Sequence, residues 1–303
     1  MTKNSFKSWI LAARPKTLTG AAVPVMIALA LAWSRCVHVN VSPQETVIPF
    51  AWIPAVLCLL FALIMQIDAN FVNDYFDFLH GNDDETRLGP KRACAMGWVS
   101  ASAMRRAIML TTATAGLVGL PLVWYGGWTM VANGLLCIVF CFLYTTCLSY
   151  HGLGDVLVLV FFGIVPVCVP YYILTHEITL EVVVASVACG IVIDTLLMVN
   201  NYRDIENDRK AGKITLAVRL GKLRSQRFYL ALAIVACLAG IVFAFSGHLW
   251  ASILPLFYLL LHIQAYHHMV RIDHGRELNR VLGETARNMF VYGLCVSIGL
   301  IIS

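Results

Sequence analysis

Long apolar runs alternate with short polar segments along the whole chain. A run of about 20 apolar residues is the length that an α-helix needs to cross the hydrocarbon of a bilayer. The sequence holds nine runs close to this length, at residues 17–34, 48–68, 106–124, 129–147, 156–174, 179–199, 228–245, 249–266 and 287–303. The pattern predicts an all-α, polytopic membrane protein with nine transmembrane helices.

Composition agrees with this pattern. Of the 303 residues, 59% are hydrophobic and only 13% are charged, whereas soluble domains carry about 25% charged residues. No soluble domain, long linker or low-complexity tract is visible, so residues 1–303 are expected to form one transmembrane domain.

The basic residues predict the orientation. All Lys and Arg residues except Arg35 fall before the first span or in every second connection, which puts them on one side of the membrane. Cytoplasmic loops carry the excess of Lys and Arg. We therefore expect a cytoplasmic N-terminus and an external C-terminus. The net charge of +5 follows from this asymmetry, and we expect no nucleic-acid partner.

One short motif occurs twice. Residues 73–77 (NDYFD) and 200–204 (NNYRD) both follow the pattern N-[DN]-Y-x-D. Each copy ends a predicted span on the cytoplasmic side, and each is followed by a further acid, which is Asp83 or Asp84 in the first copy and Asp208 in the second. Repeats in membrane proteins often form a site where their halves meet, so the pattern predicts a duplicated site.

The motifs place carboxylates and amides together. Asn73 and Asp77 are spaced i,i+4, as are Asn200 and Asp204, and this spacing brings side chains to one helix face. Unpaired acids close to lipid are costly, so a positive partner is expected. Nearby Arg and Lys would supply one as structural ion pairs. Alternatively, the oxygens would bind Mg²⁺, which prefers carboxylates together with substrate phosphates.

We favour the second explanation, a metal-bridged diphosphate site that faces the cytoplasm. The candidate metal ligands are Asn73, Asp77, Asp83, Asn200, Asp204 and Asp208. The basic residues expected to meet phosphate oxygens are Arg87, Lys91, Lys210 and Lys213.

A diphosphate at the mouth of a helical bundle suggests a substrate with an isoprenoid tail that leaves toward the bilayer. Ionising an allylic C–O bond leaves a carbocation, which aromatic faces favour. Tyr144 and Tyr202 are candidates for this role, as are Tyr75, Phe76 and Phe78, with ordinary packing as the alternative for each.

Several stretches resemble the UbiA superfamily of intramembrane prenyltransferases. They are RPKTL at 14–18, NDYFD at 73–77, RLGP at 87–90, LGD at 153–155 and NNYRDIENDRKAGKITLAVRLG at 200–221. The resemblance is strongest to the branch that acts on 1,4-dihydroxy-2-naphthoate in menaquinone synthesis. It implies nine helices around a central cavity in a bacterial cytoplasmic (inner) membrane. It also implies Mg²⁺-dependent transfer of a polyprenyl group from polyprenyl diphosphate, with loss of CO₂ and diphosphate.

The resemblance also assigns roles to single positions. Asn73, Asp77, Asp204 and Asp208 match the metal-binding set. The chain departs from the common NDxxDxxxD pattern because Gly81 follows Asp77 by four residues, and the later Asp83 or Asp84 replaces that acid. Lys213, within the stretch AGKIT, resembles a diphosphate contact.

Other residues have two open explanations. Arg14 and Lys16 would hold the acceptor's carboxylate or a phosphate, or would snorkel to the interface. The deep acids Asp68 and Asp194 would activate the acceptor's hydroxyl or would be held structurally. Asp155 is expected to line the cavity, and the candidate catalytic groups are Asp155, Tyr144 and Asp68.

Three other functions compete with this prediction. The first is a prenyltransferase of the same type that acts on another acceptor, such as 4-hydroxybenzoate, homogentisate or haem. A CDP-alcohol phosphotransferase would also use intramembrane acids, but its compact DG…AR…G…D…D pattern is absent. A cation-coupled transporter would hold such acids near the bilayer midplane, whereas these acids lie at one interface.

Overall fold

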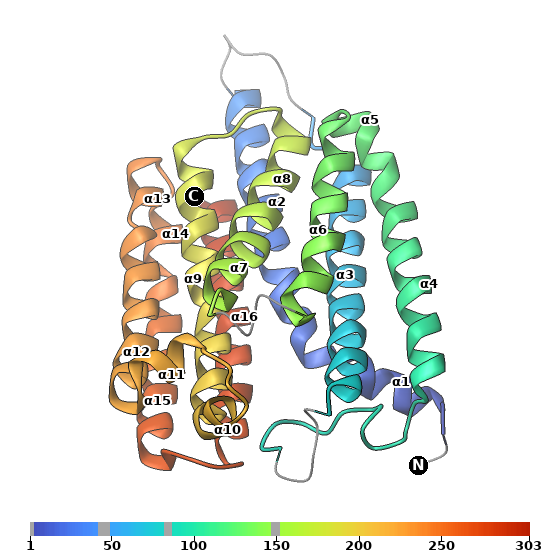
Figure 1. Cartoon of the computed structure of the whole chain (residues 1–303). Helices are drawn as coiled ribbons and strands as arrows, with labels where there is room; N and C mark the ends of the chain where they lie inside the picture. Colours follow the sequence, from blue (N-terminus) through green and yellow to red (C-terminus); the bar gives the residue numbers. More distant parts are fainter. Residues whose placement is uncertain (1–2, 42–48, 82–86, 147–151) are drawn as a thin grey trace.

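The structure, a computed structural model, describes residues 3–41, 49–81, 87–146 and 152–303, and within them helices are joined by turns and irregular segments. The long helices stand side by side with their axes roughly aligned (Figure 1). The described segments contain no β-strand. The predicted all-α class is therefore confirmed.

The helices of the first half precede residue 147. They are α1 (Phe6–Ala13), η1 (Pro15–Thr17), α2 (Leu18–Val41), α3 (Trp52–Leu79), α4 (Ala101–Gly119), η2 (Leu120–Leu122), α5 (Val123–Gly126) and α6 (Thr129–Thr146).

The second half follows residue 151. Its helices are α7 (Gly154–Val158), η4 (Leu159–Ile164), α8 (Val165–Thr175), α9 (Leu180–Arg203), α10 (Ile205–Lys210), α11 (Leu216–Leu220), α12 (Lys222–Ala239), α13 (Val242–Phe245), α14 (Leu249–Ile253), α15 (Pro255–Ile272) and α16 (Leu278–Ile302).

Eight helical stretches among the described residues are long and apolar enough to cross a membrane. They are Phe6–Val37, Trp52–Leu79, Ala101–Gly126, Gly154–Thr175, Leu180–Arg203, Lys222–Phe245, Leu249–Ile272 and Leu278–Ile302. Each overlaps one predicted span. The remaining predicted span, 129–147, falls on α6, whose apolar part Thr129–Tyr144 is shorter. The structure thus supports eight spans, and the total of nine stays a prediction.

Helix α3 continues eleven residues beyond its predicted end at residue 68, so the whole NDYFD motif lies inside it. Its polar residues are bound by neighbouring segments and do not end the helix. Asn70 Nδ2 donates to the Ala13 carbonyl and to Thr17 Oγ1, both at 2.9 Å. Tertiary hydrogen bonds of this kind satisfy polar groups that hydropathy alone assigns to a loop.

The span 154–175 contains a π-helical segment, η4, between α7 and α8. It packs closely against α9 at a pair of glycines. A Cβ atom on Gly163 would lie 2.7 Å from Gly190 Cα and 2.7 Å from the Ser186 carbonyl oxygen. Small residues permit such close approach between membrane helices. The segment η4 directly follows α7 (Gly154–Val158), the short helix that carries Asp155.

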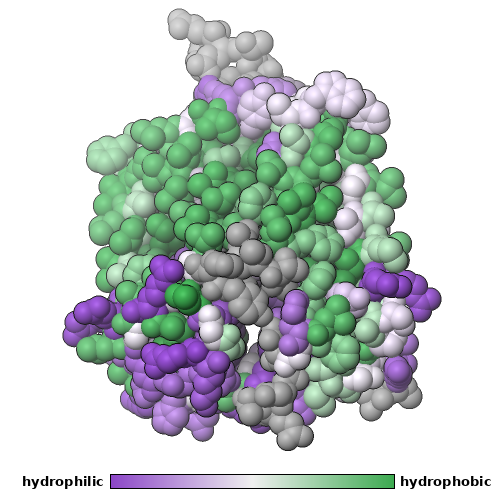
Figure 2. Space-filling view, viewed as in Figure 1, coloured by the Kyte–Doolittle hydropathy of each residue, from purple (hydrophilic) through white to green (hydrophobic). Residues whose placement is uncertain are grey.

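The two ends of the molecule differ from its middle. Hydrophobic residues form a broad belt, and hydrophilic residues gather at the lower end around α10 and α11 (Figures 1 and 2). The largest buried cluster joins α2, α8, α9 and α16, and a separate cluster joins α1, α3 and α4. The polar end is where both sequence motifs lie.

Candidate active site

The two motifs lie at the same end of the bundle. Helices α3 and α9 both run toward the lower end in Figure 1, and each carries its motif over its last turns. The first motif ends inside α3. The second crosses the boundary at Asp204, which caps the C-terminus of α9 and precedes α10.

One arginine joins the amide and the carboxylate of the first motif. Arg92, from the connection that follows α3, donates to Asn73 Oδ1 through Nη1 and pairs with Asp77 through Nη2. The neighbouring Asp74 is buried, and its carboxylate accepts hydrogen bonds from the backbone N–H groups of Ala93 (2.8 Å) and Cys94 (2.9 Å). The carboxylate of Asp74 therefore holds the segment that delivers Arg92.

The second motif has the same arrangement with a different arginine. Arg203 Nε donates to Asp204 Oδ1 at 2.9 Å, and Nη2 donates to Asp204 Oδ2 at 2.5 Å and to Asn200 Oδ1 at 2.8 Å. Its Nη1 donates to Asn279 Oδ1 at 2.7 Å. Arg203 is 5% exposed, so the guanidinium is buried with its charge balanced by this network.

Neither the contact of Arg92 with the first motif nor that of Arg203 with the second was predicted from the sequence. Structural ion pairs were one of the two explanations that the sequence analysis gave for the acids, and they are present at Asp77 and Asp204. Arg203 is adjacent to Asp204 and three residues after Asn200, so helical spacing offered a signal. Arg92 lies in a connecting segment, and no local spacing places it at Asn73.

Asp208 differs from the other motif acids. Its side chain is 13% exposed, and the nearest cation is Lys213 Nζ, 3.9 Å from Oδ1. No hydrogen bond reaches the buried Oδ2 atom from the residues described. Burial raises the pKa of Asp208 to about 6; Lys213 opposes this rise and Asp204 adds to it.

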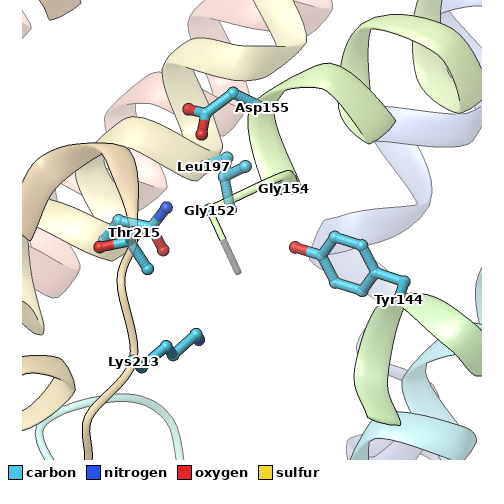
Figure 3. A pocket seen from close by; sticks show the side chains of 8 residues that line it. Tyr144, Gly152, Gly154, Asp155, Leu197, Lys213 and Thr215 are labelled. Carbon is cyan, nitrogen blue, oxygen red and sulfur yellow. The ribbon is translucent and has the colours of Figure 1, made fainter. Parts of the chain in front are cut away.

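A small pocket lies beside Asp208 and Lys213. The hydroxyl of Tyr144 and the amine of Lys213 point into the same space, with Asp155 above them (Figure 3). The lining residues are Tyr144, Gly152, Gly154, Asp155, Leu197, Asn201, Lys213 and Thr215. The pocket therefore draws on α6, α7, α9 and the segment after α10. The larger central cavity that the resemblance implies stays a prediction.

Three predicted site residues, Tyr144, Asp155 and Lys213, line this pocket, and a further acid, Asp194, lies close to Tyr144 and Asp155. Tyr144 lies near the carboxyl groups of Asp155, Asp194, Asp77 and Asp208. The Oδ1 atoms of Asp155 and Asp194 are buried, and no hydrogen bond from the described residues reaches either. Unsatisfied buried carboxylate oxygens are rare in folded proteins. Their position beside Tyr144 is consistent with a site that binds a polar ligand.

Asp68 has a different environment. It is fully buried, and its two oxygens accept hydrogen bonds from Thr111 and Thr112 on α4, the second at 2.8 Å. These contacts favour the structural role that the sequence analysis left open.

Tyr202 is also engaged elsewhere. Its hydroxyl donates to Asp273 Oδ1 at 2.9 Å and accepts from Gln226 Nε2 at 2.8 Å. Lys222 donates to the other oxygen of Asp273 at 3.1 Å, and these two donors hold the pKa of Asp273 below its ordinary value. Through this hydroxyl, Tyr202 joins the end of α9 to Asp273, which follows α15. Its predicted contact with substrate stays a prediction.

The basic residues predicted to bind substrate differ in their position and exposure. Arg14 lies near Arg92, Asp74, Arg87 and Asp77, which places it at the first motif. Lys16, Lys91 and Lys210 are exposed. Arg87 Nε donates to the Pro90 carbonyl at 3.2 Å. Residues 83 and 84 lie outside the described residues, so the predicted ligand Asp83 stays a prediction.

The donor atoms fit a hard divalent cation. Among the described segments, no three His, Cys, Asp or Glu side chains cluster closely enough to hold a metal by themselves. The predicted set, however, includes the amides of Asn73 and Asn200, and all its donors are oxygens, as Mg²⁺ prefers. The buried Oδ2 of Asp208 receives no hydrogen bond from the described part of the chain. Each Asp204 oxygen keeps a second lone pair beyond its bond to Arg203.

Comparison with known proteins places these features in a family. Residues 21–294 match the UbiA prenyltransferase family. The chain is 33% identical to the 1,4-dihydroxy-2-naphthoate octaprenyltransferase of Haemophilus influenzae, over 100% of this chain and 98% of that protein. It is also 33% identical to the enzyme of the same name from Escherichia coli, over 98% and 96% of the two chains.

Solved structures share the fold. A UbiA homologue from Archaeoglobus fulgidus bound to DMAPP and Mg²⁺ superposes with a TM-score of 0.65 at 12% identity, over 96% of this chain and 99% of that one. The family match, the relatives that align over their whole lengths and the helical fold agree. The chain is a multi-pass membrane protein that belongs to the UbiA prenyltransferase family.

Proposed function

We propose that this protein transfers a polyprenyl group from polyprenyl diphosphate to 1,4-dihydroxy-2-naphthoate, with loss of CO₂ and diphosphate, to give demethylmenaquinol. The observation that carries the proposal is the placement of two N-[DN]-Y-x-D motifs at the same end of the bundle, at which the pocket of Tyr144, Asp155 and Lys213 also lies. The relatives named for this reaction support the naphthoate acceptor. Another aromatic acceptor, such as 4-hydroxybenzoate, is the alternative that the test must separate.

The proposed metal is Mg²⁺, as in the A. fulgidus homologue. Asn73, Asp77, Asn200, Asp204 and Asp208 would hold it, and Asp83 would complete the set. When bound, the cation supplies electrostatic stabilisation to the departing diphosphate. The proposal is supported by the oxygen donors of both motifs and by the unsatisfied Oδ2 of Asp208.

The chain's own residues then bind and orient the substrates. Lys213 lies beside Asp208 with its amine in the pocket, which suits a diphosphate oxygen (Figure 3). The ring of Tyr144 offers an aromatic face for the positive charge that develops on the allylic carbon. Asp155 has a buried oxygen that no described residue bonds. We assign it the proton of an acceptor hydroxyl, because loss of this proton makes the ring carbon that attacks the allylic carbon more electron-rich.

We also propose that the motif end faces the cytoplasm of a bacterial cell and that the C-terminus lies outside. The support is the charge distribution, because all Lys and Arg residues except Arg35 fall on the motif side of the predicted topology.

The test compares Asp208→Asn with Glu206→Gln in purified, detergent-solubilised protein. Both residues lie on α10, but the side chain of Glu206 is exposed, at 65%, and its ion pair is the surface contact with Arg209 at 3.8 Å. With geranylgeranyl diphosphate, Mg²⁺ and 1,4-dihydroxy-2-naphthoate, prenylated product and released CO₂ are measured. Asp208→Asn is expected to lower kcat about a hundredfold or more, whereas Glu206→Gln leaves kcat within about twofold because surface ion pairs contribute little.

Other outcomes separate the alternatives. Turnover of 4-hydroxybenzoate without CO₂ release, and none of naphthoate, would overturn the proposed acceptor but keep the site. No prenyl transfer to any acceptor by folded protein would overturn the reaction and return attention to cation transport. Chelation of Mg²⁺ with EDTA should abolish turnover, and added Mg²⁺ should restore it.

A further inference from the structure

The connection between α15 and α16 contacts the loops of both motifs. Asn279, in the first turn of α16, accepts a hydrogen bond from Arg203 Nη1 through Oδ1 at 2.7 Å. Its Nδ2 donates to the Leu88 carbonyl at 2.8 Å. One amide side chain therefore joins the arginine of the second motif to the segment that follows the first.

Two further contacts tighten the same junction. Arg276 Nη2 donates to the Arg87 carbonyl at 3.3 Å. Gly89 lies directly against Arg203, because a Cβ atom on this glycine would be 2.9 Å from Nη2 and 3.4 Å from Cζ. The first-motif connection thus passes directly over the guanidinium, and a side chain at residue 89 would press on it.

The guanidinium transmits this contact to the second motif. Arg203 holds Asn200 and Asp204 with Nε and Nη2, and it uses Nη1 for Asn279. Removing Asn279 leaves a buried donor without this partner and releases the Leu88 segment at the same time. The loss of this partner for Arg203 and the release of the Leu88 segment would both allow the distance between the acids of the two motifs to change.

We propose that Asn279 is a positioning residue that fixes the two acidic motifs relative to each other. The inference rests on the proposed function, because it takes the motifs to form one metal–diphosphate site. An asparagine is suited to the position because its planar amide presents an acceptor to Arg203 and a donor to Leu88 in one group. Asn279 itself touches neither metal nor substrate.

The side-chain chemistry predicts a graded series. Asn279→Asp keeps an acceptor for Arg203 but turns a carboxylate oxygen toward the Leu88 carbonyl, where no donor remains. Asn279→Leu preserves the approximate size and removes both bonds. Outer residues that orient metal ligands change metal affinity by about 10- to 100-fold. We expect about tenfold weaker metal binding for Asn279→Asp and a larger loss for Asn279→Leu.

A matched control lies on the same helix. Asn288 is a fully buried asparagine of α16 whose Nδ2 donates to the Leu261 carbonyl at 3.0 Å. Among the described residues its hydrogen bonds join it to Arg287 and Leu261, and neither belongs to a motif. Asn288→Leu should lower the melting temperature in detergent as Asn279→Leu does, but it should leave metal affinity within about twofold of the wild type.

The experiment measures Mn²⁺ binding to purified protein from the loss of the free-ion electron paramagnetic resonance signal, together with the Mg²⁺ concentration for half-maximal turnover. We expect the Asn279 variants to bind Mn²⁺ more weakly and to need more Mg²⁺ for half-maximal turnover. Saturating Mg²⁺ should partly restore their kcat. Wild-type Mn²⁺ affinity in Asn279→Leu would overturn the positioning role while leaving the proposed function intact. A wild-type protein that binds no Mn²⁺ would overturn the proposed metal site and this inference with it.

Discussion

At the residue scale, two buried acids show how environment separates roles. Both oxygens of Asp68 are occupied by threonine hydroxyls of α4. Asp155 lies in the pocket opposite Tyr144 with an oxygen that no described residue bonds (Figure 3). A carboxylate whose acceptor sites are filled by neutral donors is held in place. One that lacks partners is available to a ligand.

Because of this difference, a change from Asp to Asn is expected to affect turnover at one position and stability at the other. Asp155→Asn should lower kcat by about a hundredfold or more, because it removes a proposed base. Asp68→Asn should leave kcat within about threefold and lower the melting temperature, since one hydrogen bond contributes about 1 kcal/mol. Steady-state kinetics and thermal unfolding in detergent measure both. Loss of turnover in Asp68→Asn at an unchanged melting temperature would instead support the catalytic role that the sequence suggested.

At the element scale, the π-helical segment η4 and α9 are held together by Gly163 and Gly190. A methyl group on Gly163 would approach backbone atoms of α9 to 2.7 Å, and backbone cannot move aside as a side chain does. Segment η4, which carries Gly163, directly follows α7, which carries Asp155. Packing of these helices therefore supports the pocket as well as the fold.

Gly163→Ala should destabilise the protein by about 1–3 kcal/mol, because it overpacks a tight interface. Gly134→Ala on α6 is the control, since a Cβ there meets nothing within 4 Å. Alanine at this position should be neutral or stabilising by up to about 1 kcal/mol. Melting temperatures in detergent compare the two variants. Equal stability of both would contradict the close contact between η4 and α9.

At the scale of the whole molecule, sidedness joins the charge pattern to the site. The hydrophilic residues around α10 and α11 lie at the motif end of the hydrophobic belt (Figure 2). The connection between α13 and α14, which includes the exposed Ser246, lies at the other end (Figure 1). The predicted orientation puts Ser246 outside and α10 in the cytoplasm.

Cysteine labelling tests this orientation. A membrane-impermeant maleimide added to intact cells should label Ser246→Cys, and it should label Glu206→Cys only after permeabilisation. The unmodified chain supplies the background, because its described free cysteines are buried or half-buried. Labelling of Glu206→Cys in intact cells would reverse the proposed topology.

Some of these features are local in the chain, and the sequence alone determined them. Apolar length predicted the membrane helices, because crossing hydrocarbon demands about 20 residues whatever surrounds them. The spacing within N-[DN]-Y-x-D marked the two motifs, and the stretch 200–221 indicated the family that the comparison then confirmed.

The tertiary structure decided which partners these residues meet. Arg92 reaches Asn73 from a connecting segment, Asp68 is bound by α4, and Asn279 joins Arg203 to Leu88 from the last helix. Each contact joins positions far apart in sequence, and its geometry arises from helix packing that no local pattern encodes. The helices and motifs followed from local chemistry, whereas the contact of Arg92 with the first motif and the link between the two motifs through Asn279 followed only from the folded bundle.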